Sequence, residues 1–89
     1  MRTIWKLSVP VTDDFERTLP KASEVLSVGL DAHGELCLWF LVPDTEAEQS
    51  VRRFHVVGTG NPLRVSWSKF LGTVAMPPFV WHFFEELGS

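Results

Sequence analysis

The stretch EVLSVGLDAHGELCLWFLV, residues Glu24 to Val42, decides the fold of this chain. It predicts two β-strands joined by a turn at Asp31-Ala32-His33-Gly34, because the closing glycine allows the positive φ that a tight hairpin needs. In the first strand Leu26, Val28 and Leu30 alternate with smaller or polar residues. We therefore expect this strand to bury one face and to leave the other in water.

The second strand, Leu36 to Val42, is apolar on both of its faces. One face carries Leu36, Leu38 and Phe40, and the other carries Cys37, Trp39 and Leu41. Such a strand must be covered on both sides, by another sheet, by a segment of its own chain or by a second subunit.

The rest of the chain shows further short strand patterns separated by turn residues. Strands are expected over residues 3–9, 15–19, 51–57, 69–76 and 79–84. For residues 15–19 a helix from Thr12 is the alternative, because acidic residues favour a helix N-terminus. Pro20 leaves that helix little room, so the strand is preferred. The patterns predict a mainly β fold, a small single-domain barrel or sandwich of about six or seven antiparallel strands, with a polar tail from about Glu85.

Composition argues against several classes of function. A formal net charge of -3 and a pI near 5.5 argue against nucleic-acid binding, which needs a basic surface. One cysteine makes no internal disulfide, which fits a reducing compartment. The N-terminus has no signal-peptide pattern, and no apolar run is long enough to span a membrane. A cytoplasmic location without membrane contact is therefore expected.

The loop Gly58-Thr59-Gly60-Asn61 is the candidate ligand site, because glycines allow successive N–H groups to surround an anion. Arg52, Arg53 or Arg64 would add charge, and the residues assigned to a nucleotide-like anion are Gly58, Thr59, Gly60, Asn61 and Arg53. The loop lacks the Gly-Lys-Ser/Thr ending of a phosphate loop, so a structural turn is the stronger interpretation.

No metal, cofactor or catalytic residue is expected. The spacing of His33, His55, His82 and Cys37 matches no zinc pattern. Cys37 lies between two leucines in the middle of a strand, where a thiol is usually an inert small hydrophobe.

The surplus of aromatic residues instead predicts an interface. Four Trp and seven Phe are many for a chain of 89 residues, and Trp5, Trp39, Trp67 and Trp81 are first of all core candidates. Some of the surplus is expected on a surface that a partner covers. The candidate interface residues are Cys37, Trp39, Leu41, Trp81 and Phe83, and the expected partner is a second copy of the chain or a host protein.

Several landmarks occur together in order along nearly the whole chain. They are Thr3-Ile4-Trp5-Lys6, Leu26-Ser27-Val28, Cys37-Leu38-Trp39, Gly58-Thr59-Gly60-Asn61-Pro62, Gly72-Thr73-Val74 and Val80-Trp81-His82-Phe83-Phe84-Glu85. In these landmarks the chain resembles a family of short proteins encoded by bacteriophages, prophages and their bacterial hosts. It departs from that family at Asn61, where a histidine is usual, and in a shorter, less acidic segment at 63–69. The resemblance implies no activity and no catalytic residue.

Together these observations predict a small non-enzymatic protein that acts by protein–protein interaction. The resemblance implies an origin in a mobile element, and with it the inhibition of a host defence system. The alternatives are a protein that binds or sequesters a nucleotide-like anion, and an accessory or structural protein of the virion.

Overall fold

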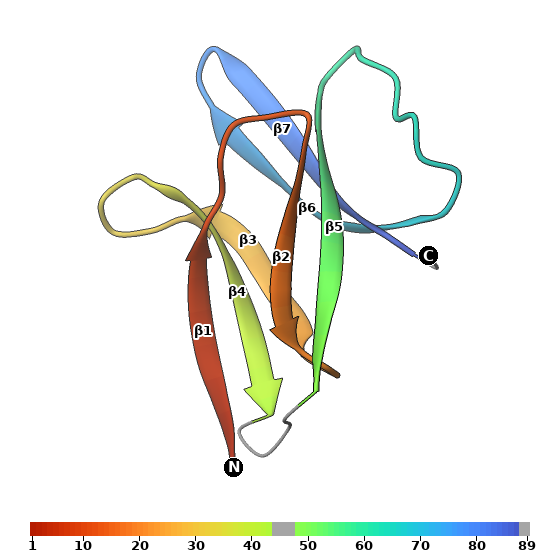
Figure 1. The fold of residues 1–89 in the computed structure, drawn as a ribbon. Helices are drawn as coiled ribbons and strands as arrows, with labels where there is room; N and C mark the ends of the chain where they lie inside the picture. The colour runs from red at the N-terminus through yellow and green to blue at the C-terminus, as the bar shows by residue number, and fades with distance from the viewer. Residues whose placement is uncertain (44–47, 88–89) are drawn as a thin grey trace.

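The computed structural model describes residues 1–43 and 48–87, and these residues form seven strands in two antiparallel sheets (Figure 1). The strands are β1 (Arg2–Ser8), β2 (Asp14–Pro20), β3 (Glu24–Leu30), β4 (Leu36–Pro43), β5 (Gln49–Gly58), β6 (Ser68–Met76) and β7 (Phe79–Glu86). Sheet A has the order β1-β4-β3 and sheet B the order β2-β5-β7-β6. The mainly β prediction is confirmed. The two sheets pack as a sandwich and are not closed into a barrel.

The predicted hairpin forms β3 and β4, and its turn is held by a single aspartate. The Asp31 carboxylate accepts hydrogen bonds from the backbone N–H of His33 at 2.8 Å and of Glu35 at 2.9 Å. Gly34 takes a φ of +78°, which a residue with a Cβ rarely adopts. The turn residues therefore set the register of the central strand pair.

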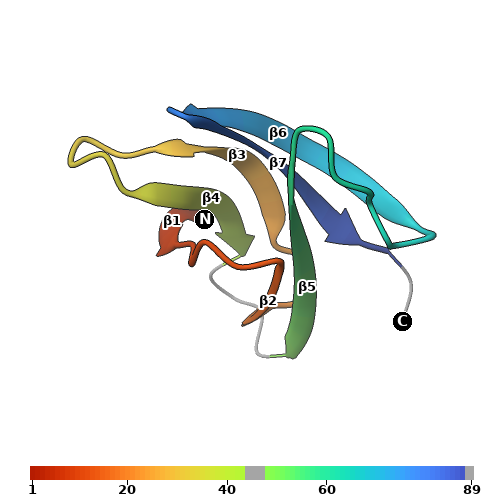
Figure 2. The same ribbon diagram turned by 90° about the horizontal axis from the view of Figure 1, so that it is seen from above.

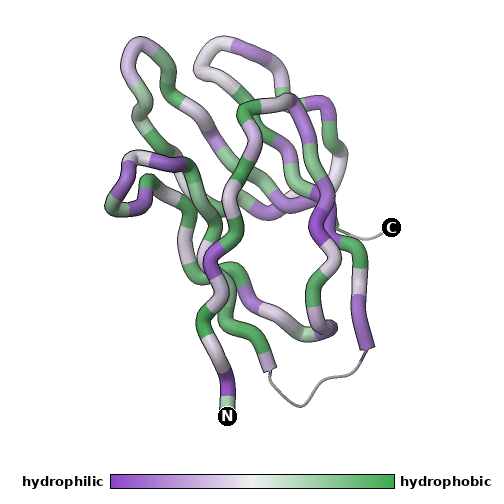
Figure 3. The backbone as a smooth tube through the Cα atoms, turned by 60° about the vertical axis from the view of Figure 1, so that its left-hand side comes forward, coloured by the Kyte–Doolittle hydropathy of each residue, from purple (hydrophilic) through white to green (hydrophobic). Residues whose placement is uncertain are grey.

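Sheet B curves around sheet A and covers the inner face of β4 (Figure 2). Hydrophobic and hydrophilic residues alternate along the tube in Figure 3, as expected for strands with one buried face. The rings of Phe15 and Phe54 stack at 5.1 Å, and Phe40 meets Phe54 edge-on at 6.1 Å. The buried core consists of Val9, Phe15, Leu19, Leu36, Leu38, Phe40, Val42, Phe54, Val56, Val74 and Phe83.

The outer face of β4 is covered by residues of the neighbouring strands in the same sheet. Gly29 lies opposite Cys37, and it leaves room for the ring of Trp39, which would be 3.8 Å from a Cβ built at this glycine. On the same face, Lys6 forms an ion pair with Asp31 at 3.0 Å, and the Cys37 sulfur lies 3.8 Å from that carboxylate. The predicted double burial of this strand is thus met within one chain for Cys37, while Trp39 and Leu41 remain half-buried.

Two β-bulges change which residues face the core. The register shifts between Val25 and Ser27, so Leu26 leaves the alternation and is 46% exposed. A second shift between Phe70 and Gly72 turns Phe70 outward, to 55% exposure. The expectation that Leu26 shares a buried face with Val28 is therefore wrong, because a bulge reverses the alternation beyond it.

The C-terminal residues described by the structure also differ from the prediction. Glu85 and Glu86 belong to β7 and not to a polar tail. Glu85 is buried, because Arg52 of β5 donates two hydrogen bonds to its carboxylate and a third to the carbonyl of Ser23, at 2.6 Å. Breaking a buried pair of this kind usually costs several kcal/mol, about 3–5. Residues 88–89, the end of the predicted tail, lie outside the described residues.

Residues 15–19 lie in a strand, as preferred, and the helical alternative is wrong. Phe15 pairs with Phe54 and Leu19 with Ser50, so this segment gains a ladder of hydrogen bonds from β5 that a short helix before Pro20 would lack. Within residues 1–43 and 48–87, the chain has no helix capable of crossing a membrane.

Gly72 of β6 lies close against Val28 of β3 and gives a first prediction. A Cβ at Gly72 would lie 2.7 Å from Val28 Cγ1, and the stiff valine cannot turn away. We expect Gly72→Ala to lower the free energy of unfolding by about 1–3 kcal/mol in urea denaturation. Gly29→Ala is the matched control, because its Cβ meets its nearest neighbour, Trp39, at 3.8 Å. Equal effects of the two substitutions would refute this account of the packing.

Candidate functional site

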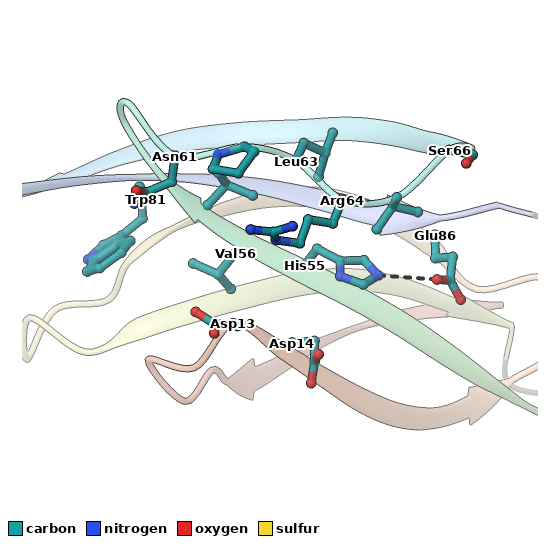
Figure 4. Close-up of a pocket in the computed structure, with 14 residues that line it drawn as sticks. Asp13, Asp14, His55, Val56, Asn61, Leu63, Arg64, Ser66, Trp81 and Glu86 are labelled. Carbon is teal, nitrogen blue, oxygen red and sulfur yellow. Dashed lines mark hydrogen bonds and ion pairs between the residues drawn. The ribbon is translucent and has the colours of Figure 1, made fainter.

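A hollow lies between β5 and the loop that follows it (Figure 4). It has a volume of about 710 Å³ and is open to solvent on one side. Residues 61–66 form its upper wall, Asp13 and Asp14 lie on the opposite side of β5, and Arg64 and His55 point into the space between (Figure 4). The hollow exists because β2 pairs with β5 only as far as His55, which leaves the last residues of β5 beside the loop.

The predicted ligand loop borders this hollow, but not all of its amides are available to an anion. The N–H of Thr59 donates to the Val80 carbonyl at 3.2 Å, and the N–H of Asn61 donates to the Gly58 carbonyl at 3.0 Å. Gly60 has a φ of +94°, which closes a tight turn. Two of the four amides are therefore used within the fold, in accord with the structural-turn interpretation.

The arginine assigned to this site lies elsewhere. Arg53 is on β5 five residues before Gly58, about 16 Å along the strand. It is exposed and forms an ion pair with Glu16 at 3.5 Å. Arg64 takes its place in the hollow, but together with the three carboxylates of Asp13, Asp14 and Glu86. An anion in the hollow would thus meet more negative than positive side chains, and the charges do not favour it.

Two of the three histidines, His55 and His82, are held by structural partners. His55 lies 3.3 Å from the Glu86 carboxylate, and the two ring nitrogens of His82 bond the hydroxyls of Thr59 and Thr73 at 2.8 and 2.9 Å. Among the described residues, no group of three or more His, Cys, Asp or Glu is placed to hold a metal ion. Cys37 is fully buried, and burial raises the pKa of its thiol.

The predicted interface residues divide into two groups. Cys37 and Phe83 have no exposed surface, so neither can touch a partner and the prediction is wrong for both. Trp39 and Leu41 are half-buried on the outer face of sheet A. Trp81 is also half-buried, because its ring stacks on Phe79 at 5.3 Å. The central strands of the sheets need their large side chains for the core, and a sequence does not separate central strands from edge strands.

The residues that sequence reasoning missed are on β1, the strand at the open edge of sheet A. Ile4 is 61% exposed and Trp5 is 41% exposed, although Trp5 was predicted in the core. β1 pairs with β4 through seven consecutive residue pairs, from Arg2↔Pro43 to Ser8↔Cys37, and contacts little else in the described chain. The available signal was Lys6 within the strand, because edge strands commonly carry lysine.

The backbone direction along β1 follows from one hydrogen bond. The N–H of Val9, the residue after β1, donates to the Leu36 carbonyl at 2.9 Å. In an antiparallel pair, alternate residues turn their backbone groups toward and away from the neighbouring strand. The N–H and C=O groups of Arg2, Ile4 and Lys6 therefore point away from β4, into the space beside the sheet. The carbonyl of Ser8 points the same way and accepts a hydrogen bond from Arg17 at 3.0 Å.

The charge on β1 does not block this edge. A lysine on an edge strand commonly prevents other strands from pairing. Here the Lys6 ammonium lies on the outer face of sheet A, 3.0 Å from Asp31, and not beyond the edge. This hydrogen bond raises the pKa of Lys6. The edge thus presents a row of backbone donors and acceptors beside the exposed side chains of Ile4 and Trp5.

Comparison with known proteins identifies the family. The chain belongs to the family described as Domain of unknown function (DUF7352), which matches residues 1–89. No curated protein and no solved structure matches the chain.

The buried thiol gives a second prediction. Because Cys37 is fully buried and its pKa is raised by burial, we expect thiol reagents to label it only when the chain unfolds. The labelling rate should rise with urea in parallel with the unfolding transition. Rapid labelling of the folded protein at neutral pH would contradict this expectation and would reopen a nucleophilic role for the cysteine.

The Asp31 carboxylate gives a third prediction, on pH. The backbone N–H of Glu35, followed by Lys6, lowers the pKa of Asp31 from 3.8 to about 2. A lowered pKa in the folded state stabilises the fold above the unfolded value and loses this effect as the carboxylate is protonated. We expect Asp31→Asn to lower the melting temperature at neutral pH, with the difference from the wild type shrinking as the pH falls from 3.8 to about 2. A difference that is constant across this range would contradict a charge effect.

Proposed function

We propose that this protein acts without catalysis, by binding another polypeptide strand along the open edge of β1. The observation that carries the proposal is a difference between the four edge strands, which are β1 and β3 in sheet A and β2 and β6 in sheet B. β3 and β6 each contain a bulge, and they pack against each other. β2 carries charged residues and ends on Pro20. β1 alone among the four has neither a bulge nor a proline, and its outward backbone groups are in position to continue the sheet.

Strand addition needs no pocket and no reactive side chain. Each backbone hydrogen bond gained contributes about 0.5–1.5 kcal/mol net, and exposed apolar side chains beside the edge add burial. Ile4 and Trp5 supply that apolar surface on opposite faces of the strand. The hollow beside β5 supports a ligand-binding function less well, because carboxylates outnumber the arginine among its charged residues and two of the four loop amides are used within the fold.

The resemblance to phage and prophage proteins defines the foreign partner to be tested. Where the bound strand belongs to a foreign protein, we propose a host protein as the partner and interference with a host defence system as the role. An accessory role in the virion would use the same edge. The unpaired thiol of Cys37 is compatible with a reducing compartment, so the partner is to be sought in the cytoplasm.

Photo-crosslinking from the edge tests the proposal and is the fourth prediction. Ile4 and, as a matched control, Val51 of β5 are replaced by the photoreactive amino acid p-benzoylphenylalanine. The two native side chains are 61% and 58% exposed. We expect position 4 to form polypeptide adducts, to a second copy or to a foreign protein, several-fold more than position 51. Equal labelling from both positions, in the purified protein and in lysate, would overturn strand addition at β1.

A further inference from the structure

We infer that the polypeptide bound along β1 is a second copy of this chain, paired antiparallel through β1 about a twofold axis at Trp5. The inference rests on the proposed function and names its partner. The two copies would join their three-stranded sheets into one continuous sheet of six strands.

The axis at Trp5 follows from the direction of the backbone groups. This axis places residue i of one copy opposite residue 10 − i of the other, so Ile4 lies opposite Lys6 and Arg2 opposite Ser8. All four residues turn their backbone groups outward, as the bond between Val9 and Leu36 requires, and of these groups the Ser8 carbonyl already accepts one bond from Arg17. Ile4 and Lys6 thus exchange hydrogen bonds across the edge, twice by symmetry, and Trp5 forms the central pair without backbone bonds.

The side chains are also complementary in this register. The two copies of Trp5 become direct cross-strand neighbours, an aromatic pair that covers a side chain now 41% exposed. On the other face Ile4, 61% exposed, lies against the methylene groups of the opposite Lys6, whose ammonium is already held by Asp31.

Neighbouring registers are less favourable. An axis at Ile4 would place Arg2 directly opposite Lys6 on both sides of the dimer, and like charges facing each other across strands are destabilising. An axis at Thr3 would pair only residues 2–4 of the two copies of β1 and would shorten the ladder. The register centred on Trp5 uses the whole strand and opposes no like charges.

The first test is the molar mass in solution, by light scattering over a range of concentrations, and it is the fifth prediction. We expect the mass to rise from 10.1 kDa toward twice that value. Ile4→Pro removes an N–H that faces the open edge and spares the ladder to β4, as proline on an edge strand allows. It should weaken dimerisation about thirtyfold, because two symmetric hydrogen bonds are lost. Ile4→Ala, which keeps the N–H, should weaken it less.

A disulfide experiment tests the register. It does not depend on the proline variant and so remains decisive if that variant fails to fold. Chains carrying Arg2→Cys and chains carrying Ser8→Cys are oxidised separately and as a mixture. Only the mixture should give a linked dimer, because positions 2 and 8 oppose each other at about 5.5 Å between Cα atoms. In either variant alone the two cysteines would be six residues apart along the strands, about 20 Å.

The outcomes separate this inference from the proposed function. A monomer at all concentrations, with adducts from position 4 to a foreign protein, overturns the second copy and keeps strand addition. A dimer without the mixed disulfide, or one unaffected by Ile4→Pro in a folded variant, overturns the pairing at Trp5. A monomer without adducts overturns both.

Discussion

The burial of β4 on both faces is the constraint on which the rest of this structure depends. Its inner residues Leu36, Leu38, Phe40 and Val42 need a second sheet, and sheet B supplies it by curving around sheet A. Its outer residue Cys37 needs cover as well, and Gly29, Asp31 and Lys6 provide it from the two flanking strands. The apolar surface of one strand thus requires two hydrogen-bonded neighbours and an opposing sheet. The turn at Asp31 holds the strand in register.

The same arrangement creates the open edge. A sheet of three strands built around one central strand has two edges, and the packing of β3 against β6 leaves only β1 regular and unprotected. An edge of this kind is a binding surface made of backbone groups, with side chains setting partner and register. The side chains of a type that could be reactive have structural roles instead. The ring of His82 bonds two threonine hydroxyls, and Cys37 packs beside the carboxylate of an ion pair.

The candidate ligand site shows that residues typical of a ligand loop can form a structural turn instead. Gly58 to Asn61 supplies the flexible backbone of an anion loop, yet two of its amides bond other backbone carbonyls in a tight turn. Arg53 and Arg64, both basic and both near in sequence, lie in different surroundings, one paired with Glu16 and the other in the hollow. Side-chain type and spacing did not reveal this, because the pairing with Glu16 depends on β2 lying next to β5.

The sequence by itself determined the β class, the approximate place of every strand and the hairpin around Gly34, because alternation and turn residues act over a few neighbours. It also predicted that β4 would be covered on both faces, which is met on the inner face and, on the outer face, fully only for Cys37. Only the tertiary structure decided which strands are central and which form edges, and so made Cys37 and Phe83 core residues and Ile4 and Trp5 surface residues. The bulges at Leu26 and Leu71 and the burial of Glu85 by Arg52 were likewise decided there. The physical reason is that burial and strand pairing arise between segments distant in sequence, and local alternation carries no information about which segments meet.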